Sequence, residues 1–162
     1  MGLHLVLVEP EIHWNTGNVG RTALAVGATL HLVEPLGFSL DAAQVRRAGL
    51  DYWERVPLRL WPSWDALERE LPGLGAPWLF STKVERPYWD APLAATEDTV
   101  LVFGKETAGL PAPLLARYAE RCVTIPMVPA EAAAPRSLNL STAVALAAYE
   151  VLRQRRSSAA PE

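Results

Sequence analysis

Short apolar runs that alternate with helical segments are the feature that most constrains the fold of this chain. The runs 3–8 and 29–33 are largely apolar, and each is followed directly by a Glu-Pro pair. Both runs predict buried strands. Between them, Asn15 or Thr16 is a candidate N-cap for a helix over residues 17–27. The sequence therefore predicts a β-α-β unit with parallel strands and a right-handed crossover.

The same alternation continues along the rest of the chain. Further strands are predicted at 55–60, 77–82, 99–103 and 122–126, and helices at 64–71, 111–118 and 140–153. Strands separated by helices predict an α/β fold, a parallel sheet flanked by helices. A chain of 162 residues can bury one sizeable core. We therefore expect a single domain over residues 1–154, followed by a flexible tail at 155–162.

The last predicted helix, residues 140–153, has almost no polar face. Its apolar residues are Leu140, Ala143, Val144, Ala145, Leu146, Ala147, Ala148, Val151 and Leu152. A helix that is apolar nearly all round must be covered on more than one side. The sheet supplies one cover, and the simplest second cover is another copy of the chain, so the sequence predicts a homodimer.

Composition excludes several classes of protein. The lone cysteine, Cys122, allows no disulfide framework or Cys-rich metal site, and the histidines His4, His13 and His31 are too scattered to form a metal site. No run approaches the roughly 20 apolar residues of a membrane span, and the start lacks the pattern of a signal peptide. We therefore expect a cytoplasmic protein without metal. Because the net charge is −3, any RNA site must be a local basic patch.

Three loops at the ends of predicted strands are candidate ligand sites, because open parallel sheets bind ligands beyond the carboxyl ends of their strands. Loop 10–21 opens a helix with amides and glycines and places Arg21 one turn inside it. Loop 103–111 carries glycines directly after the strongest strand, and loop 125–129 leads to residues 136–141 at the start of the last helix. Taken singly, each loop also fits a helix cap or a packed turn. The second lacks the glycine spacing of a P-loop.

Taken together, the loops carry a recognisable pattern. The stretches are Glu9-Pro10-Glu11-Ile12 with Asn15-Thr16-Gly17-Asn18, Arg46-Arg47-Ala48-Gly49-Leu50-Asp51-Tyr52, Phe103-Gly104-Lys105-Glu106 with Gly109-Leu110-Pro111, and Ile125-Pro126-Met127 with Arg136-Ser137-Leu138-Asn139-Leu140-Ser141. In these stretches the chain resembles SPOUT methyltransferases of the SpoU branch, closest to the minimal tRNA (cytidine/uridine-34) 2′-O-methyltransferases. The resemblance runs from residue 3 to about residue 153. It departs at Ala108, where many relatives have a basic or polar residue, and at a short insertion over 130–135.

The resemblance implies a fold, a cofactor and a reaction. The fold is a parallel sheet whose C-terminal part is tied in a deep trefoil knot, with S-adenosyl-L-methionine (AdoMet) bound in the knotted crevice of a homodimer. General fold rules argue against a knot, so this expectation rests on the resemblance alone. The reaction is 2′-O-methylation of the ribose of the wobble nucleotide in the anticodon loop of tRNA.

The same resemblance implies roles for individual residues. The expected cofactor-binding residues are Phe80, Ser81, Gly104, Gly109, Ile125, Met127 and Ser137. The expected catalytic residues, which face the ribose, are Arg21, Asn15, Glu106, Ser137 and Asn139. Within this set we expect Arg21 to stabilise the developing alkoxide, because a guanidinium with a pKa above about 12 is a poor base. Glu106 is expected to orient Arg21 or to bind ribose hydroxyls.

RNA contacts are expected from scattered cations and exposed aromatics. The candidate cations are Arg46, Arg47, Lys83, Arg86, Arg153, Arg155 and Arg156, and the candidate stacking residues are Tyr52, Trp53, Tyr88 and Trp89.

Three alternative functions stay open from the sequence. Two keep the fold: 2′-O-methylation of another tRNA or rRNA ribose, and a non-catalytic knotted module that binds AdoMet or RNA. The third is a nicotinamide or flavin oxidoreductase, because Gly17, Gly20 and Glu34 imitate part of a dinucleotide fingerprint. The tight Gly-x-Gly pair of that fingerprint is missing.

Overall fold

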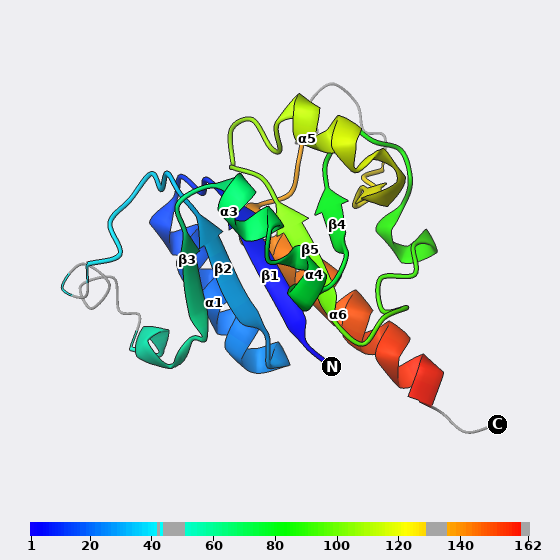
Figure 1. Cartoon of the computed structure of the whole chain (residues 1–162), viewed down its shortest axis with the longest axis horizontal. Helices are drawn as coiled ribbons and strands as arrows, with labels where there is room; N and C mark the ends of the chain where they lie inside the picture. The colour runs from blue at the N-terminus through cyan, green and yellow to red at the C-terminus, as the bar shows by residue number, and fades with distance from the viewer. Residues whose placement is uncertain (42, 44–50, 129–135, 160–162) are drawn as a thin grey trace.

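The computed structural model describes residues 1–41, 43, 51–128 and 136–159, and the motif at 46–50 and the insertion at 130–135 lie outside them. Its strands form one parallel sheet in the order β3-β2-β1-β5-β4-β6 (Figure 1). The strands are β1 (Leu3–Val8), β2 (Thr29–Val33), β3 (Leu58–Trp61), β4 (Pro77–Phe80), β5 (Thr99–Phe103) and β6 (Cys122–Val123). The prediction of a parallel sheet flanked by helices is confirmed.

Helices cover both faces of this sheet (Figure 1). One face carries α1 (His13–Val26) and α6 (Leu140–Ala159), which lie against each other. The other carries α3 (Trp64–Glu68), α4 (Leu71–Leu74) and α5 (Ala112–Arg117). Short 3₁₀ turns η1 (Trp53–Arg55), η2 (Tyr88–Asp90) and η3 (Ala119–Arg121) connect the elements.

Side chains on the two faces of the sheet belong to two separate hydrophobic clusters. In β1, Leu5 and Leu7 belong to the cluster under α1 and α6, whereas Val6 and Val8 belong to the cluster under α3, α4 and α5. A parallel sheet that is covered on both faces needs apolar residues at successive positions of its central strands. That requirement explains the apolar runs of the sequence. Cys122, at the edge of the sheet, is buried, and burial raises the pKa of its thiol.

Helix α1 begins earlier than predicted. It starts at His13, so Asn15 and Thr16 lie buried inside its first turn and neither is the N-cap, which is Ile12. Ile12 has no side chain able to cap, and a carboxylate from a distant loop performs that role: the backbone N–H groups of Glu11 and Ile12 both donate to Glu106. A cap that comes from far along the chain leaves no local signal.

Other boundaries also differ from the predictions. The helix predicted over 64–71 is two short helices, and Pro72, which lacks an N–H, lies in the first turn of the second. The strand predicted over 55–60 begins later, as β3. The strand predicted over 122–126 ends earlier, as β6.

The chain end differs most from its prediction. The tail expected to be flexible from residue 155 is helical as far as Ala159. Gln154 and Arg155 hold this extension to the body of the protein: Gln154 donates to the carbonyl of Ala91 at 3.0 Å, and Arg155 to that of Gly2 at 2.7 Å. Within the described residues, no helix is long and apolar enough to cross a membrane.

Candidate active site

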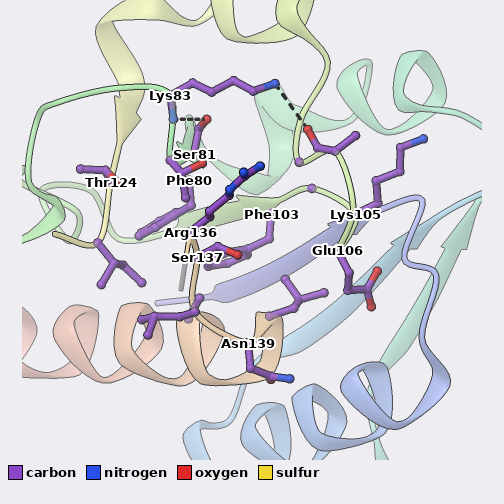
Figure 2. A pocket seen from close by; sticks show the side chains of 18 of the residues that line it. Phe80, Ser81, Lys83, Phe103, Lys105, Glu106, Thr124, Arg136, Ser137 and Asn139 are labelled. Atoms are coloured by element: carbon purple, nitrogen blue, oxygen red, sulfur yellow. Dashed lines mark hydrogen bonds between the residues drawn. The ribbon is translucent and has the colours of Figure 1, made fainter. Parts of the chain in front are cut away.

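A cavity of about 520 Å³ opens beyond the carboxyl ends of β4 and β5, beside the start of α6 (Figure 2). It lies at the sheet edge where the sequence predicted ligand sites. Its lining includes Asn15, Phe80, Ser81, Gly104, Glu106, Gly109, Ile125, Met127, Ser137 and Asn139. Every predicted site residue except Arg21 therefore lines one cavity, although these residues come from five separate segments of the chain.

The loop after β5 forms one wall of the cavity and folds back tightly on itself. Gly109 donates its N–H to the carbonyl of Lys105 at 2.9 Å, and its φ of +67° is a left-handed conformation that favours glycine. A Cβ on Gly104 would lie 2.1 Å from the carbonyl carbon of Gly109. Glycine at 104 thus allows the two ends of this loop to approach each other closely.

Two stacked aromatic rings form an apolar wall. The rings of Phe80 and Phe103 lie 4.7 Å apart at an interplanar angle of 21°, and both side chains are buried. Tyr88 lies against Phe80 at 6.2 Å. A flat apolar wall with a few polar groups around it is typical of small-molecule sites. Phe103 was not predicted as a site residue, although it is the last residue of the strongest strand.

The Glu106 carboxylate is directed at the N-terminus of α1. It accepts hydrogen bonds from the backbone N–H groups of Glu11 (2.8 Å) and Ile12 (3.1 Å) and from the Asn15 amide (3.2 Å). A helix N-terminus carries a partial positive charge, so a carboxylate there is favourable. The expectation that Glu106 orients Arg21 is not what these hydrogen bonds show, because they hold the start of α1.

A chain of side-chain hydrogen bonds continues from Glu106 to α6. The Asn139 amide donates to the Asn15 carbonyl oxygen at 2.9 Å, and the Asn139 carbonyl oxygen accepts from the Ser141 backbone at 2.9 Å. Asn139 therefore caps α6. We call Glu106, Asn15 and Asn139 the amide relay. Each amide nitrogen has two hydrogens, and these bonds use one, so both amides keep an N–H for a ligand.

Arg21 lies apart from the other predicted catalytic residues. It is exposed on α1, and its place six residues after Asn15 puts it about 9 Å further along the helix axis. It is close to Tyr52, whose hydroxyl donates to the Gly17 carbonyl at 2.8 Å. Burial raises the pKa of Tyr52, and the charge of Arg21 acts against that rise. Within one copy of the chain, Arg21 does not line the cavity formed by the described residues.

Cations at the cavity were largely missed from the sequence. Lys83, Lys105 and Arg136 all line it, yet only Lys83 was proposed as an RNA contact. The positions of Lys105, two residues after β5, and of Arg136, just before α6, are the signals that could have identified them. Among the described residues, no group of His, Cys, Asp or Glu side chains is placed to hold a metal ion.

Comparison with known proteins agrees with this geometry. Residues 2–149 match the SpoU rRNA Methylase family. The tRNA (cytidine(34)-2'-O)-methyltransferase of Burkholderia cenocepacia (strain HI2424) is 46% identical over 153 residues, which are 93% of this chain and 94% of that protein. The protein of the same name from Acidovorax sp. (strain JS42) is 46% identical over 154 residues, 93% of this chain and 91% of that one.

Solved structures show the same fold. One that concerns 2-OH methylation of C/U34 on tRNA has a TM-score of 0.83 and 46% identity and covers 96% of this chain and 97% of its own. The SpoU methyltransferase AviRb from Streptomyces viridochromogenes, in complex with AdoMet, has a TM-score of 0.72 and 26% identity and covers 96% of this chain and 58% of its own. The chain therefore belongs to the SpoU methylase family, as its sequence motifs predicted.

Proposed function

We propose that this chain is an AdoMet-dependent methyltransferase that modifies the 2′-hydroxyl of the wobble nucleotide, the cytidine or uridine at position 34 of tRNA. The observation that carries the proposal is a single cavity with an aromatic wall on one side and the amide relay on the other. Relatives that match nearly the full length of the chain bear this activity in their names. Such a substrate places the protein in the cytoplasm.

The cavity fits AdoMet in size and chemistry. Its volume of about 520 Å³ lies within the roughly 300–1,000 Å³ of ordinary small-molecule pockets. Phe80 and Phe103 offer a flat surface for an adenine ring, and the loops at Gly104 and Ile125 offer backbone groups to hold the rest of the molecule. When bound, AdoMet supplies an activated methyl group, so the chain itself needs neither a nucleophile nor a metal.

We further propose the trefoil knot and the homodimer. The chain leaves β6 at one edge of the sheet, and α6 then lies beside α1 under the centre of the sheet, a path that suits a knotted C-terminal segment. For the homodimer, the support is exposed apolar surface: Trp14 on α1 is 59% exposed, and Leu146 and Tyr149 on α6 are 41% and 55% exposed. Large apolar side chains on two adjacent helices favour burial against a second copy.

The amide relay and Arg21 would have different roles in the reaction. The free N–H groups of Asn15 and Asn139 orient the ribose, and positioning of this kind supplies much of the rate in a transfer from an activated donor. Arg21 stabilises the alkoxide that develops as the 2′-hydroxyl passes its proton to a phosphate oxygen of the RNA. Trp14 and Arg21 are seven residues apart and so share a face of α1. A homodimer formed through that face would place Arg21 at the interface, where it could act on a substrate held by both copies.

The first experiment measures methyl transfer from labelled AdoMet to bulk tRNA that lacks its native 2′-O-methyl groups, with nucleoside mapping of the product. Label in a 2′-O-methylated wobble nucleotide supports the proposal. Label at another ribose would support 2′-O-methylation as the reaction but would identify a different target nucleotide. AdoMet binding without transfer to tRNA or rRNA would identify a non-catalytic module.

Arg21→Ala tests the catalytic assignment. Loss of preorganised charge at a transition state typically costs about 3–4 kcal/mol, so turnover should fall roughly 10²–10³-fold while AdoMet affinity is retained. Arg21→Lys should fall nearly as far, because a point charge lacks the planar fork of a guanidinium. Arg55→Ala, another exposed arginine, is the matched control. Unaltered turnover in Arg21→Ala would refute the role of Arg21.

A further inference from the structure

Several cations of this acidic chain are committed to holding the fold. Arg117 pairs with Glu68 at 2.6 Å, and Arg153 pairs with Glu150 at 2.8 Å. Others donate to backbone carbonyls: Arg155 to Gly2 at 2.7 Å and Arg121 to Pro77 at 2.8 Å. Arg86 and Arg121 also lie over the ring of Trp78. These contacts make Arg86, Arg153 and Arg155 poor candidates for the RNA contacts that the sequence suggested.

The cations at the cavity form fewer contacts of this kind with the rest of the protein. Within the described chain, neither Lys83 nor Arg136 forms an ion pair, and Lys105 has only Glu9 at 3.8 Å. The Lys83 ammonium donates to the Ala108 carbonyl at 3.4 Å, which is long for such a bond. Glu106, the acidic residue in the cavity lining, is already held by N–H donors. The mouth of the cavity therefore carries two cations, Lys83 and Arg136, that no carboxylate of the described residues pairs with, although the chain carries −3.

The arrangement of these side chains is directional. In Figure 2, Lys83 reaches from the loop after β4 across to the Ala108 carbonyl in the loop after β5, and Asn139 lies on the opposite side of the cavity, at the start of α6. Arg136 extends between them. A charged side therefore faces the side that carries the amide relay.

We propose that Lys83 and Arg136, with a smaller contribution from Lys105, bind the phosphodiester groups that flank the target ribose. We call these three residues the cationic rim. The inference rests on the proposed function, because a ribose that enters the cavity brings its two phosphates to the mouth. Lys83 places a charge beside Ala108, whose own side chain has none. Lys105 contributes less because Glu9 already balances part of its charge.

The test is the salt dependence of binding between unmodified tRNA and the full chain. Removal of one phosphate contact lowers the slope of log affinity against log salt by about 0.7–0.9. Lys83→Ala and Arg136→Ala should each show this change, which weakens binding about five- to eightfold at 0.1 M salt and has no effect near 1 M. The loss should be the same for tRNAs with altered anticodon bases, since phosphate contacts read no sequence. AdoMet affinity and thermal unfolding should match those of the wild type.

Arg69→Ala is the matched control, because Arg69 is an exposed cation at the C-cap of α3, away from the cavity, and should leave the slope unchanged. Wild-type slopes in both rim variants would overturn the inference. So would a loss of AdoMet affinity with an unchanged slope, which would assign the rim to the cofactor carboxylate. Wild-type protein that binds tRNA through the rim but transfers no methyl group would leave the rim standing and refute the proposed function.

Discussion

The Glu106 carboxylate is predicted to act as the N-terminal cap of α1, and Glu106→Gln tests this with the smallest change of shape. One carboxylate oxygen accepts from the Glu11 N–H and the other from Ile12 and Asn15. A glutamine can keep only one of these oxygens, because its amide nitrogen presents hydrogens toward donors. The substitution therefore loses at least one charge-assisted hydrogen bond and the interaction of a negative charge with the helix terminus.

The expected loss of stability follows from these contacts. A hydrogen bond to a charged group contributes about 1.5–3 kcal/mol, and a charge at a helix terminus about 0.3–1 kcal/mol. Glu106 is only partly buried, which moves the sum toward its lower end. We expect Glu106→Gln to lower the free energy of unfolding by about 2–3 kcal/mol, which at about 2–4 °C per kcal/mol is roughly 4–12 °C in melting temperature.

The assay is urea and thermal unfolding of Glu106→Gln beside Glu85→Gln. Glu85 is exposed after β4, so its variant should stay within about 0.5 kcal/mol of the wild type. Methyl transfer should fall in Glu106→Gln, because the start of α1 carries Asn15, while AdoMet affinity should change little. Wild-type stability combined with lost turnover would refute the reasoning, since Glu106 would then act on the substrate and not on the helix.

Two further predictions concern the sheet and the loop after β5. Burial, followed by the nearby His4, lowers the pKa of His31 to about 3, below its unfolded value of 6.5. The unfolded chain then binds more protons, so stability should be complete above about pH 6.5 and decline by a few kcal/mol toward pH 3; an equally steep decline in His31→Phe, measured by urea unfolding, would contradict this. Gly104→Ala should abolish AdoMet binding and lower the melting temperature, because its Cβ would meet backbone at 2.1 Å. Gly73→Ala, where nothing lies within 4 Å, is the control that should melt like the wild type.

The strands could be predicted because a strand that is buried on both faces of the sheet needs apolar residues at consecutive positions. The runs 3–8, 29–33 and 99–103 became β1, β2 and β5 with unchanged boundaries. The alternation of strands and helices also predicts parallel strands joined by crossovers, but it does not predict that β1 lies beside β5. A short edge strand such as β6 has fewer apolar residues in register, and its end was misplaced.

The misplaced helix ends share another cause. The start of α1 depends on Glu106, and the extension of α6 depends on the contacts of Gln154 and Arg155 with Ala91 and Gly2. Each of these partners is far away in the sequence. Capping signals and helical periodicity are local, so neither could reveal a helix end that is stabilised from another part of the fold.

All predicted site residues except Arg21 line one cavity, but their arrangement there could not be predicted from the sequence. The motifs identified the residues that meet at the cavity, but they could not show that Glu106 bonds to α1, or that Arg21 lies outside the cavity of its own copy. A sequence motif shows which residue types stand at which positions. The hydrogen-bond partners of these residues depend on where their side chains point in the folded protein. The amide relay is therefore a finding of the structure.

The acidic balance of the chain is compatible with a polyanionic substrate because charge acts locally. At physiological ionic strength exposed charges are screened beyond about 8 Å. Glu68 and Glu150 each lie within hydrogen-bond distance of an arginine, so their charges are balanced where they stand. At the cavity, by contrast, Lys83 and Arg136 lack carboxylate partners among the described residues, and Glu106 faces a helix terminus. A phosphate group that approaches the cavity therefore interacts with the cations at its mouth and much less with the net charge of the chain. A homodimer would present two such mouths.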